Sequence, residues 1–267
     1  MTGEGRKGQD TADPMRDALI AAAIDAYEDA GLSGLCVEGR WEAAVDAMRH
    51  VELQPRDRIV EMTRSVSALV SAVGGASAAP PGGGSVAASA GALAAALTRM
   101  VAGLTAGRPR YAHVAAAMQE AADRASALAV ELTDLVRRDA AAFDAVSAAY
   151  GLPRETADAT AARQEAIEHA MVPATRSPLD VARAAAEVAE LGAMIAEEGN
   201  RNAVADAAVA VLLADAACRA AALTVRVNAP GLRDRQIATA MAEEAVAHTG
   251  RAASATARAV AAVERTA

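Results

Sequence analysis

The shortage of large side chains constrains this chain more than any other feature of its sequence. Hydrophobic residues make up 53% of the chain, yet only 2% is aromatic, and alanine accounts for about three residues in ten. A core of alanine, valine and leucine suits closely packed helices, because alanine has the highest helix propensity. A β-sandwich would need many more β-branched and aromatic residues. At 267 residues the chain can form one large helical domain or two small ones.

Charge and cysteine content exclude several classes of protein. A net charge of −8 argues against a broad nucleic-acid surface. Cys36 and Cys218 are too few for a disulfide scaffold or a cysteine-rich zinc site, which fits a reducing cytoplasm. The four histidines lack metal-binding spacing and are expected to face solvent, namely His50, His113, His169 and His248. We therefore expect a cytoplasmic protein with no metal site and no nucleic-acid partner.

Two segments need to be distinguished from targeting or membrane sequences. Residues 1–15 are polar and contain no apolar run, so they predict a disordered tail and no secretory signal. The uncharged stretch from Ser65 to Thr98 is long enough to span a membrane. The PPGGG run at 80–84 breaks it into two alanine-, glycine- and serine-rich halves. A buried helix of a soluble protein is the better interpretation, with no membrane partner.

Apolar residues recur at spacings of three and four through most of the chain, which predicts helices. Two short helices, 17–30 and 39–50, would form a helical hairpin within residues 16–54, and Pro55 marks a linker after it. Residues 55–267 are predicted to form one further domain, an all-α bundle of long alanine-rich helices. Its expected helices cover 58–73, 85–104, 111–150, 157–170, 178–198, 202–227 and from 233 towards the end.

The first feature that could carry chemistry is the run PPGGGS, which opens the alanine-rich helix. Gly82, Gly83 and Gly84 let the backbone approach a ligand closely, and Ser85 follows at the start of the helix. The first N–H groups of a helix have no intrahelical partner and favour an anion. No Gly-Lys-Ser/Thr follows, so this is not a nucleotide-binding P-loop. A tight turn and a close helix crossing would explain the same glycines without any ligand.

The second feature is a carboxylate on an apolar stripe. Leu128, Leu132, Leu135, Asp139, Ala142, Val146 and Ala149 follow a regular alternation of four and three. Asp139 lies in the middle of this stripe, and burying an unpaired carboxylate is unfavourable. It must therefore be partnered, protonated or directed at a ligand. The sequence leaves a structural role for Asp139 as open as a catalytic one.

The third feature is the segment EEGNRNAVADAAVAVLLADA. Gly199 would end one helix, Asn200 or Asn202 would cap the next, and Asp206 follows one turn later. Asp206 shares its helix face mainly with alanine and leucine. Two carboxylates converging in an alanine-rich bundle could perform acid–base chemistry. Helix-end stabilisation is the alternative interpretation of such aspartates.

Taken together, four stretches resemble one family. They are APPGGGSVAASAGALAAALTRMVAGLTAGRPRY, DAAAFDAVSAAYGLP, SPLDVA and EEGNRNAVADAAVAVLLADAACRAAALTVRVNAPGLRDR, in family order across residues 58–250. They are similar to the cyclodeaminase/cyclohydrolase domain that acts on one-carbon tetrahydrofolates. That domain forms the C-terminal half of formiminotransferase-cyclodeaminase and occurs alone as a bacterial methenyltetrahydrofolate cyclohydrolase. The stretches FDAVSAAYGLP and VNAPGLRDR look closer to the stand-alone cyclohydrolases.

The resemblance implies site residues. Its Asp-x-x-x-Phe stretch falls on Asp139 to Phe143, which makes Asp139 the implied catalytic acid–base. The chain departs from the family pattern at Ala205, where serine is usual, at Arg99, and at Thr224, where asparagine is frequent. The implied substrate-binding residues are Gly82, Gly83, Gly84, Ser85, Arg108, Arg110, Asn200, Asp206 and Asn228. The two arginines would meet the anionic glutamate tail of a folate.

The resemblance also implies a reaction and an assembly. The expected reaction is hydrolysis of 5,10-methenyltetrahydrofolate to 10-formyltetrahydrofolate. Formiminotetrahydrofolate cyclodeaminase activity and a non-catalytic folate-binding or assembly protein are the alternatives. The tetrahydrofolate derivative would be the substrate, and no cofactor is expected. A homodimer is expected, because the alanine and glycine stripes also permit close helix contact. The role of the 16–54 hairpin lies outside the resemblance.

Overall fold

The computed structural model describes residues 14–33, 36–49, 65–75 and 81–266. The chain divides into two compact units, Met1–Gly74 and Gly75–Ala267. Most of the predicted tail and the predicted linker around Pro55 lie outside the described residues. The predicted first bundle helix, 58–73, is described only from 65, where a short helix at 65–73 is present.

The first unit contains the two helices of the expected hairpin, α1 (Pro14–Leu32) and α2 (Val37–Arg49). Arg40 on α2 holds them together: its Nε donates to the Tyr27 carbonyl at 3.1 Å, and its guanidinium lies 4.0 Å from the Tyr27 ring centroid. Trp41 contacts the same ring edge-to-face but stays 60% exposed. The hairpin therefore has a contact between its helices but little buried core.

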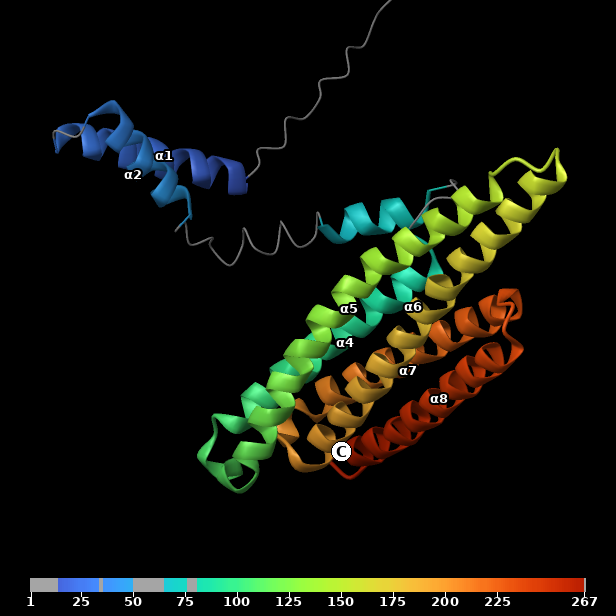
Figure 1. Cartoon of the computed structure of the whole chain (residues 1–267). Helices are drawn as coiled ribbons and strands as arrows, with labels where there is room; N and C mark the ends of the chain where they lie inside the picture. Colours follow the sequence, from blue (N-terminus) through green and yellow to red (C-terminus); the bar gives the residue numbers. More distant parts are fainter. Residues whose placement is uncertain (1–13, 34–35, 50–64, 76–80, 267) are drawn as a thin grey trace, which may run out of the picture. The chain divides into compact units, whose positions relative to one another are not determined.

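The second unit is a bundle of long helices lying side by side (Figure 1). Its order is α4 (Gly83–Ala106), the 3₁₀ turn η1 (Pro109–Val114), α5 (Ala115–Tyr150), α6 (Ala157–Glu198), η2 (Arg201–Ala203), α7 (Val204–Asn228), η3 (Ala229–Gly231) and α8 (Arg235–Glu264). No residue that the structure describes forms a strand, so the expected all-α class is confirmed. Helix α6 packs against α4, α5, α7 and α8 and is central to the bundle.

Two sequence-based boundaries were wrong. The helix expected from Tyr111 begins at Ala115, because Tyr111 is buried in a 3₁₀ turn where its hydroxyl accepts from the Arg201 N–H at 3.1 Å. The expected helices 157–170 and 178–198 are one helix, α6, which continues through Pro173 and Pro178. Proline removes a backbone donor, but the surrounding segment is buried against neighbouring helices, and that packing outweighs the local preference.

The carbonyl that Pro178 leaves without a helical partner is that of Ala174, four residues earlier. The Asn228 Nδ2 donates to this oxygen at 2.8 Å. A side chain at the end of α7 thus replaces the hydrogen bond that proline removes from α6. This contact also fixes the end of α7 against α6.

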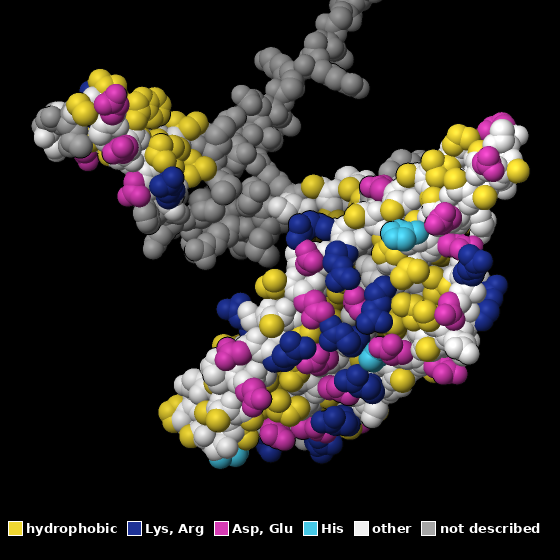
Figure 2. All heavy atoms as spheres, in the orientation of Figure 1, with side chains coloured by type: hydrophobic (Ala, Val, Ile, Leu, Met, Phe, Trp, Pro, Cys, Tyr) yellow, Lys and Arg dark blue, Asp and Glu magenta, His cyan; other side chains and the backbone are white. Residues whose placement is uncertain are grey.

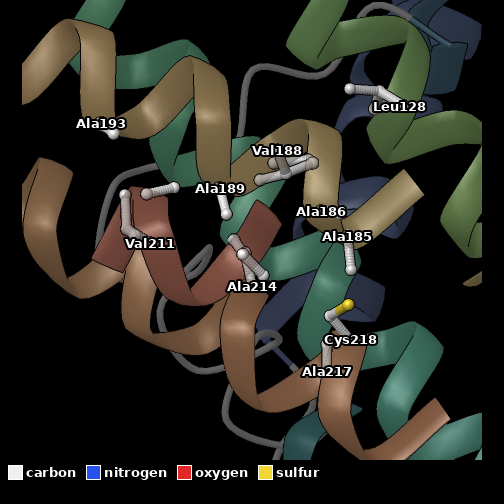
Figure 3. Packing of buried hydrophobic residues seen from close by; sticks show 14 of the residues in the cluster. Leu128, Ala185, Ala186, Val188, Ala189, Ala193, Val211, Ala214, Ala217 and Cys218 are labelled. Carbon is white, nitrogen blue, oxygen red and sulfur yellow. The ribbon is translucent and has the colours of Figure 1, made fainter. Parts of the chain in front are cut away.

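Small side chains bring the helices close together. The main core consists largely of alanines: Ala189 and Ala193 of α6 face Val211 and Ala214 of α7, and Ala185 faces Cys218 (Figure 3). A Cβ on Gly192 would lie 2.7 Å from Val211 Cγ2. The alanine content of the sequence is therefore explained by close helix crossings in which larger side chains would clash.

Helices α4 and α7 run antiparallel. A Cβ on Gly91 would lie 3.7 Å from Ala217, whereas Gly192 lies beside both Thr98 and Val211. Moving forward along α4 from Gly91 to Thr98 therefore corresponds to moving backward along α7 from Ala217 to Val211. Extending this register, Thr224 lies level with Gly84, near the start of α4.

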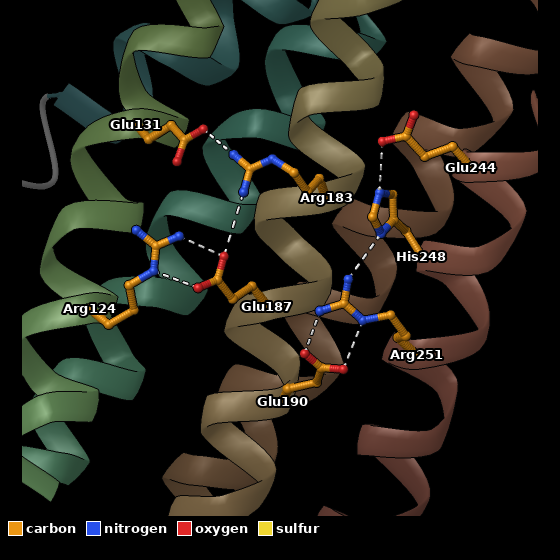
Figure 4. A network of polar contacts seen from close by, with 8 residues as sticks. All are labelled: Arg124, Glu131, Arg183, Glu187, Glu190, Glu244, His248 and Arg251. Atoms are coloured by element: carbon orange, nitrogen blue, oxygen red, sulfur yellow. Dashed lines mark hydrogen bonds and ion pairs between the residues drawn. The ribbon is translucent and has the colours of Figure 1, made fainter. Parts of the chain in front are cut away.

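The face of the bundle formed by α5, α6 and α8 carries many charged side chains (Figure 2). Arg124 and Arg251 make two-pronged ion pairs with Glu187 and Glu190, at shortest distances of 2.5 Å and 2.6 Å (Figure 4). Arg258 pairs in the same way with Glu197 at 2.5 Å, one heptad further along α6 and α8. These ion pairs link α6 to α5 on one side and to α8 on the other.

His248 does not face solvent as expected, since it is only 8% exposed. Its Nδ1 lies 3.2 Å from Arg251 Nη1, and its Nε2 lies 3.6 Å from Glu244 Oε1 (Figure 4). Burial and the neighbouring Arg251 charge lower the pKa of the His248 imidazole. His113 and His169 are exposed as expected, and His50 lies outside the described residues.

The other side of α4 and α7 is apolar and exposed. We call it the α4–α7 apolar face, and it consists of Val86, Leu93, Met100 and Leu104 on α4 and Val209, Leu212, Leu213, Leu223 and Val227 on α7. Both α4 and the segment Arg201–Gly231 are long and apolar enough to cross a membrane, although 44% of each window is buried inside the protein. An exposed apolar surface of this extent indicates a contact surface.

Candidate active site at the start of α4

The carboxylate of Asp139 lies against the first turn of α4. Ser85 Oγ donates a hydrogen bond to Asp139 Oδ2 at 2.8 Å. Asp139 is half-buried, while Leu132, Leu135 and Ala142 on the same stripe of α5 are buried. The sequence stripe is thus confirmed as the inward side of α5, with one carboxylate in it.

Gly84 explains how the carboxylate comes so close. A Cβ on Gly84 would lie 2.2 Å from Asp139 Oδ1 and 2.6 Å from its Cγ, which no side chain tolerates. A Cβ on Gly82 or Gly83 would meet nothing within 4 Å. The three glycines therefore have different roles: Gly84 makes room for Asp139, and the other two border open space.

The first turn of α4 surrounds the Asp139 side chain with hydrogen-bond donors. Gly82 is the N-cap residue of α4 and has an extended backbone. Because glycine has no side chain, it offers no cap to the first N–H groups of the helix. The positive end of the helix dipole stabilises a nearby carboxylate. The Ser85 hydrogen bond occupies Oδ2. A carboxylate held in this way can attract a cation and accept a proton from water.

Asn228 lies at the same end of the bundle, just past Thr224, and its amide is occupied by the Ala174 carbonyl. Its observed contact positions α6 and α7. A substrate contact by Asn228 stays a prediction.

The remaining predicted residues lie at the opposite end of the bundle. Arg108 and Arg110 follow the C-terminus of α4, about 36 Å along the helix from its start at 1.5 Å per residue. Asn200 is 4% exposed, and its N–H donates to Thr105 Oγ1 at 3.0 Å, which fixes it at this end. Asp206 is exposed in the first turn of α7.

Asn200 has a visible structural role. Its side chain accepts from the Asn202 N–H at 3.1 Å and caps η2, the turn that leads into α7. This agrees with the expected cap at Asn200 or Asn202. Asp206, one turn further, has no ion pair among the residues that the structure describes.

A pocket of about 870 Å³ occupies this second end of the bundle. Arg110, Arg201 and Arg265 line it together with Tyr111, and its acidic members are Glu197 and Glu198. Glu197 is already paired with Arg258. Sequence reasoning missed Arg201 and Arg265, because Arg265 reaches the pocket from the far end of the chain and no local pattern connects it with Arg110.

Within one copy, the structure therefore brings together some predicted residues and separates others. Asp139, Ser85 and the glycines meet at the start of α4, whereas Asp206, Asn200 and the two arginines lie at the other end. Asp206 precedes Thr224 by 18 residues on α7, and Thr224 lies level with Gly84. At a rise of 1.5 Å per residue, Asp206 is therefore about 27 Å from Gly84 along the bundle.

Comparison with known proteins defines the class of this all-α bundle. The model of the family described as Formiminotransferase-cyclodeaminase matches residues 65–247. The chain belongs to this family, which confirms the resemblance drawn from the sequence.

Individual relatives refine the comparison. A methenyltetrahydrofolate cyclohydrolase from Methylorubrum extorquens is 45% identical over 152 residues, covering 57% of this chain and 73% of the relative. The formimidoyltransferase-cyclodeaminase of Rattus norvegicus is 32% identical over 192 residues, covering 67% of this chain but only 35% of its own length. The crystal structure of a formiminotetrahydrofolate cyclodeaminase from Thermotoga maritima superimposes with a TM-score of 0.65 at 25% identity, covering 80% of this chain and 96% of the other.

Proposed function

We propose that this protein is an enzyme of folate one-carbon metabolism that hydrolyses 5,10-methenyltetrahydrofolate to 10-formyltetrahydrofolate. The observation that carries the proposal is the Asp139 carboxylate, held by Ser85 at 2.8 Å and fitted against the Gly84 backbone. The 45% identity to a methenyltetrahydrofolate cyclohydrolase supports the choice of reaction.

The reaction fits the chemistry of a single positioned carboxylate. The methenyl bridge is a cationic amidinium, which a carboxylate attracts. Asp139 takes a proton from water as the water oxygen bonds to the bridge carbon. The bond between that carbon and N5 then breaks: Asp139 returns its proton to N5, and the hydroxyl on the carbon releases its proton to solvent as it becomes the formyl C=O. The formyl group remains on N10, and no redox step or cofactor enters the balance.

The other predicted substrate contacts are assigned by the same chemistry. Gly82 and Gly83 border open space beside first-turn amides that no side chain caps among the described residues, which suits a carbonyl or carboxylate oxygen. Arg108 and Arg110 carry positive charge that suits the glutamate tail. These assignments, with Asn200, Asp206 and Asn228, are part of the proposal.

Formiminotetrahydrofolate cyclodeaminase activity is the second candidate. The rat relative and the Thermotoga maritima structure carry this name. In this reaction N10 bonds to the formimino carbon and closes the ring, and the same carboxylate moves the N10 proton to the nitrogen that leaves as ammonia. The position of Asp139 serves both reactions equally.

One absorbance experiment separates the two reactions. The protein is supplied with methenyl- or formiminotetrahydrofolate, and the methenyl chromophore is followed against the uncatalysed rate. Loss of the chromophore identifies the hydrolase, and its appearance identifies the deaminase. If neither occurs above background, the proposal of an enzyme acting on these folates is overturned.

Asp139→Asn tests the role of the carboxylate. Asparagine has nearly the same shape, so packing survives while charge and proton acceptance are lost. We expect turnover to fall by about 10²-fold or more, the usual range for acid–base catalysis. Turnover and thermal midpoint are measured together. Near-normal turnover in the folded variant would contradict the catalytic role and leave Asp139 a structural acid.

We also propose that the protein is a cytoplasmic homodimer whose contact is the α4–α7 apolar face. The exposed apolar residues span about 27 Å on each helix at 1.5 Å per residue, and two helices each about 10 Å wide give roughly 540 Å² per copy, about two thirds of the ~800 Å² per partner of a standard interface. In such a dimer a second copy covers these apolar side chains. The alternative is that the same face lies against a membrane. Light scattering in the absence of detergent is expected to give a dimer, and co-sedimentation with liposomes is expected to recover none of the protein.

A further inference from the structure

One buried hydroxyl of the bundle has no partner. Ser177 on α6 is 2% exposed, and its Oγ makes no hydrogen bond among the residues that the structure describes. Other buried hydroxyls behave differently, because those of Thr98, Thr105 and Thr175 donate to the carbonyl four residues earlier in their own helices. A buried polar group without a protein partner is commonly satisfied by an ordered water. The surroundings of Ser177 therefore decide what this hydroxyl serves.

The register between α4 and α6 places Ser177 beside the start of α4. These two helices run parallel, because both are antiparallel to α7. A Cβ on Gly192 of α6 would lie 3.6 Å from Thr98 Oγ1 of α4. Ser177 precedes Gly192 by 15 residues, and Gly83 precedes Thr98 by 15 residues. Ser177 is therefore level with Gly83, in the first turn of α4.

The register between α5 and α6 leads to the same level. These helices are antiparallel, and Arg138 Nη2 of α5 lies 3.0 Å from Asp180 Oδ2 of α6. Asp139 follows Arg138 and is therefore level with Leu179, about 3 Å along the axis from Ser177 at 1.5 Å per residue. Contacts to two different helices thus bring Ser177 to the level at which Asp139 meets α4.

The direction of Ser177 around α6 also fits this site. Successive residues are about 100° apart around a helix. Asp180 faces α5, where it pairs with Arg138, and Gly192 faces α4 and α7. Ser177 lies between these two directions, about 60° from each. Its side chain is therefore aimed between α4 and α5, where Asp139 lies against the first turn of α4.

Asp139 has one carboxylate oxygen available for a water. Ser85 Oγ donates to Oδ2, whereas Oδ1 accepts no hydrogen bond from the described residues. A water between Ser177 Oγ and Asp139 Oδ1 would satisfy the buried hydroxyl. The same water would have one proton directed at the base that the proposed hydrolysis requires.

We propose that Ser177 is a positioning residue that holds the water which attacks the methenyl bridge. This inference rests on the proposed function. The water donates one hydrogen bond to Asp139 and the other to Ser177 Oγ, which leaves a lone pair of its oxygen free for the bridge carbon. As the oxygen–carbon bond forms, Asp139 takes the first proton and the Ser177 hydroxyl stays protonated. Ring closure with loss of ammonia consumes no water, so Ser177 favours hydrolysis over deamination.

Ser177→Ala tests the proposal, because it removes the hydroxyl while alanine keeps the helix. We expect kcat for hydrolysis of methenyltetrahydrofolate to fall about tenfold or more, because the water is no longer oriented. KM is expected to stay unchanged, because the folate loses no contact. Any deamination of formiminotetrahydrofolate by the wild type is also expected to be unchanged. Circular dichroism and the thermal midpoint establish that the variant is folded.

Thr256→Val is the matched control. Thr256 Oγ1 is a second buried hydroxyl without a partner among the described residues, but it is on α8, away from the candidate site. Valine has nearly the same shape as threonine, so this change removes a comparable hydroxyl. We expect its kcat and KM to equal those of the wild type.

A crystal structure of the wild type gives a readout that does not depend on turnover. We expect an ordered water within hydrogen-bond distance of both Ser177 Oγ and Asp139 Oδ1, and we expect Ser177→Ala to lose it. A Ser177 hydroxyl bonded to its own helix instead of a water would overturn the proposal.

The kinetic results can overturn it as well. An unchanged kcat in folded Ser177→Ala contradicts the role of Ser177, and so does an equal loss in hydrolysis and deamination. The wild type is assayed first, because a protein that does not hydrolyse methenyltetrahydrofolate overturns the proposed function and this inference together. A wild type that hydrolyses this folate and a Ser177→Ala variant that is equally fast overturn only the role of Ser177.

Discussion

At the scale of single residues, the contact between Gly84 and Asp139 shows what the glycine run is for. A glycine-rich helix start suggests flexibility or a phosphate site. In this protein one glycine provides the space into which a carboxylate from α5 fits, 2.2 Å from where a Cβ would be. Ser85 then fixes the carboxylate through Oδ2. A fixed carboxylate is prepared for catalysis because it needs no reorganisation when the cation arrives.

Gly84→Ala is expected to lower turnover by about 10²-fold, because a catalytic group displaced by 1 Å can lose that much. Gly103→Ala, also on α4, is the matched control, since its Cβ would meet nothing within 4 Å. Alanine in a helix favours folding by up to ~1 kcal/mol over glycine, but in Gly84→Ala the contact with Asp139 opposes this gain. Steady-state rates and thermal midpoints of the two variants are compared. Equal activities would contradict the role given to Gly84.

The buried His248 makes stability depend on pH. Its folded-state pKa is lowered by burial and by Arg251, so the folded protein favours neutral imidazole. The unfolded chain then binds the additional proton first, and stability falls as the pH drops below the unfolded value of about 6.5. We expect a lower thermal midpoint at pH 5.5 than at pH 7.5, and a smaller difference in His248→Gln. Exposed His169→Gln is the control, and an unchanged difference in His248→Gln would contradict the assignment.

At the scale of elements, helix α6 shows how tertiary contacts overrule a local signal. The sequence predicted a break between residues 170 and 178, where Pro173 lies, yet the helix continues to Glu198. The segment is buried against its neighbours, and Asn228 satisfies the carbonyl of Ala174 that Pro178 leaves open. The residue that permits an uninterrupted α6 is thus on a different helix, 54 residues from that carbonyl.

Asn228→Ala is expected to destabilise the fold by about 1–3 kcal/mol, because it leaves a partly buried carbonyl without a donor. Pro178→Ala restores a backbone N–H that can reach the same oxygen. We therefore expect Asn228→Ala to be less destabilising in the Pro178→Ala background. Chemical denaturation of the wild type, the two single variants and the double variant gives their free energies of unfolding, from which the coupling between the two positions follows. Additive effects would show that the two groups do not share the Ala174 carbonyl.

At the scale of the whole molecule, the bundle has two chemically different faces. The face formed by α5, α6 and α8 carries ion pairs that bridge the helices, whereas the α4–α7 apolar face has large exposed side chains. Exposed ion pairs each contribute little to stability, but they keep a surface hydrated and monomeric. The apolar face lacks that protection, and this contrast supports its assignment as the contact between copies.

Leu93→Glu is expected to convert the dimer to monomer and to reduce turnover with it. Leu93 is 66% exposed on α4, so a charge there is tolerated by one chain and becomes unfavourable only when a second copy covers it. Val130→Glu is the control, because Val130 is 71% exposed on α5, outside the face. Light scattering and turnover are measured for both. A dimeric Leu93→Glu protein would place the contact elsewhere.

The helical class, the family and the candidate carboxylate could all be predicted from the sequence, because each depends on local composition, spacing or short motifs. The apolar period placed Asp139 on the inward side of a helix before any packing was known. The packed bundle was needed to show that Gly84 makes room for this carboxylate and that α6 continues through its prolines. It also decided that Asp206 and the arginines lie far from Asp139 within one chain. Such facts depend on which helices are neighbours and in what direction they run, and those contacts connect residues that no local pattern relates.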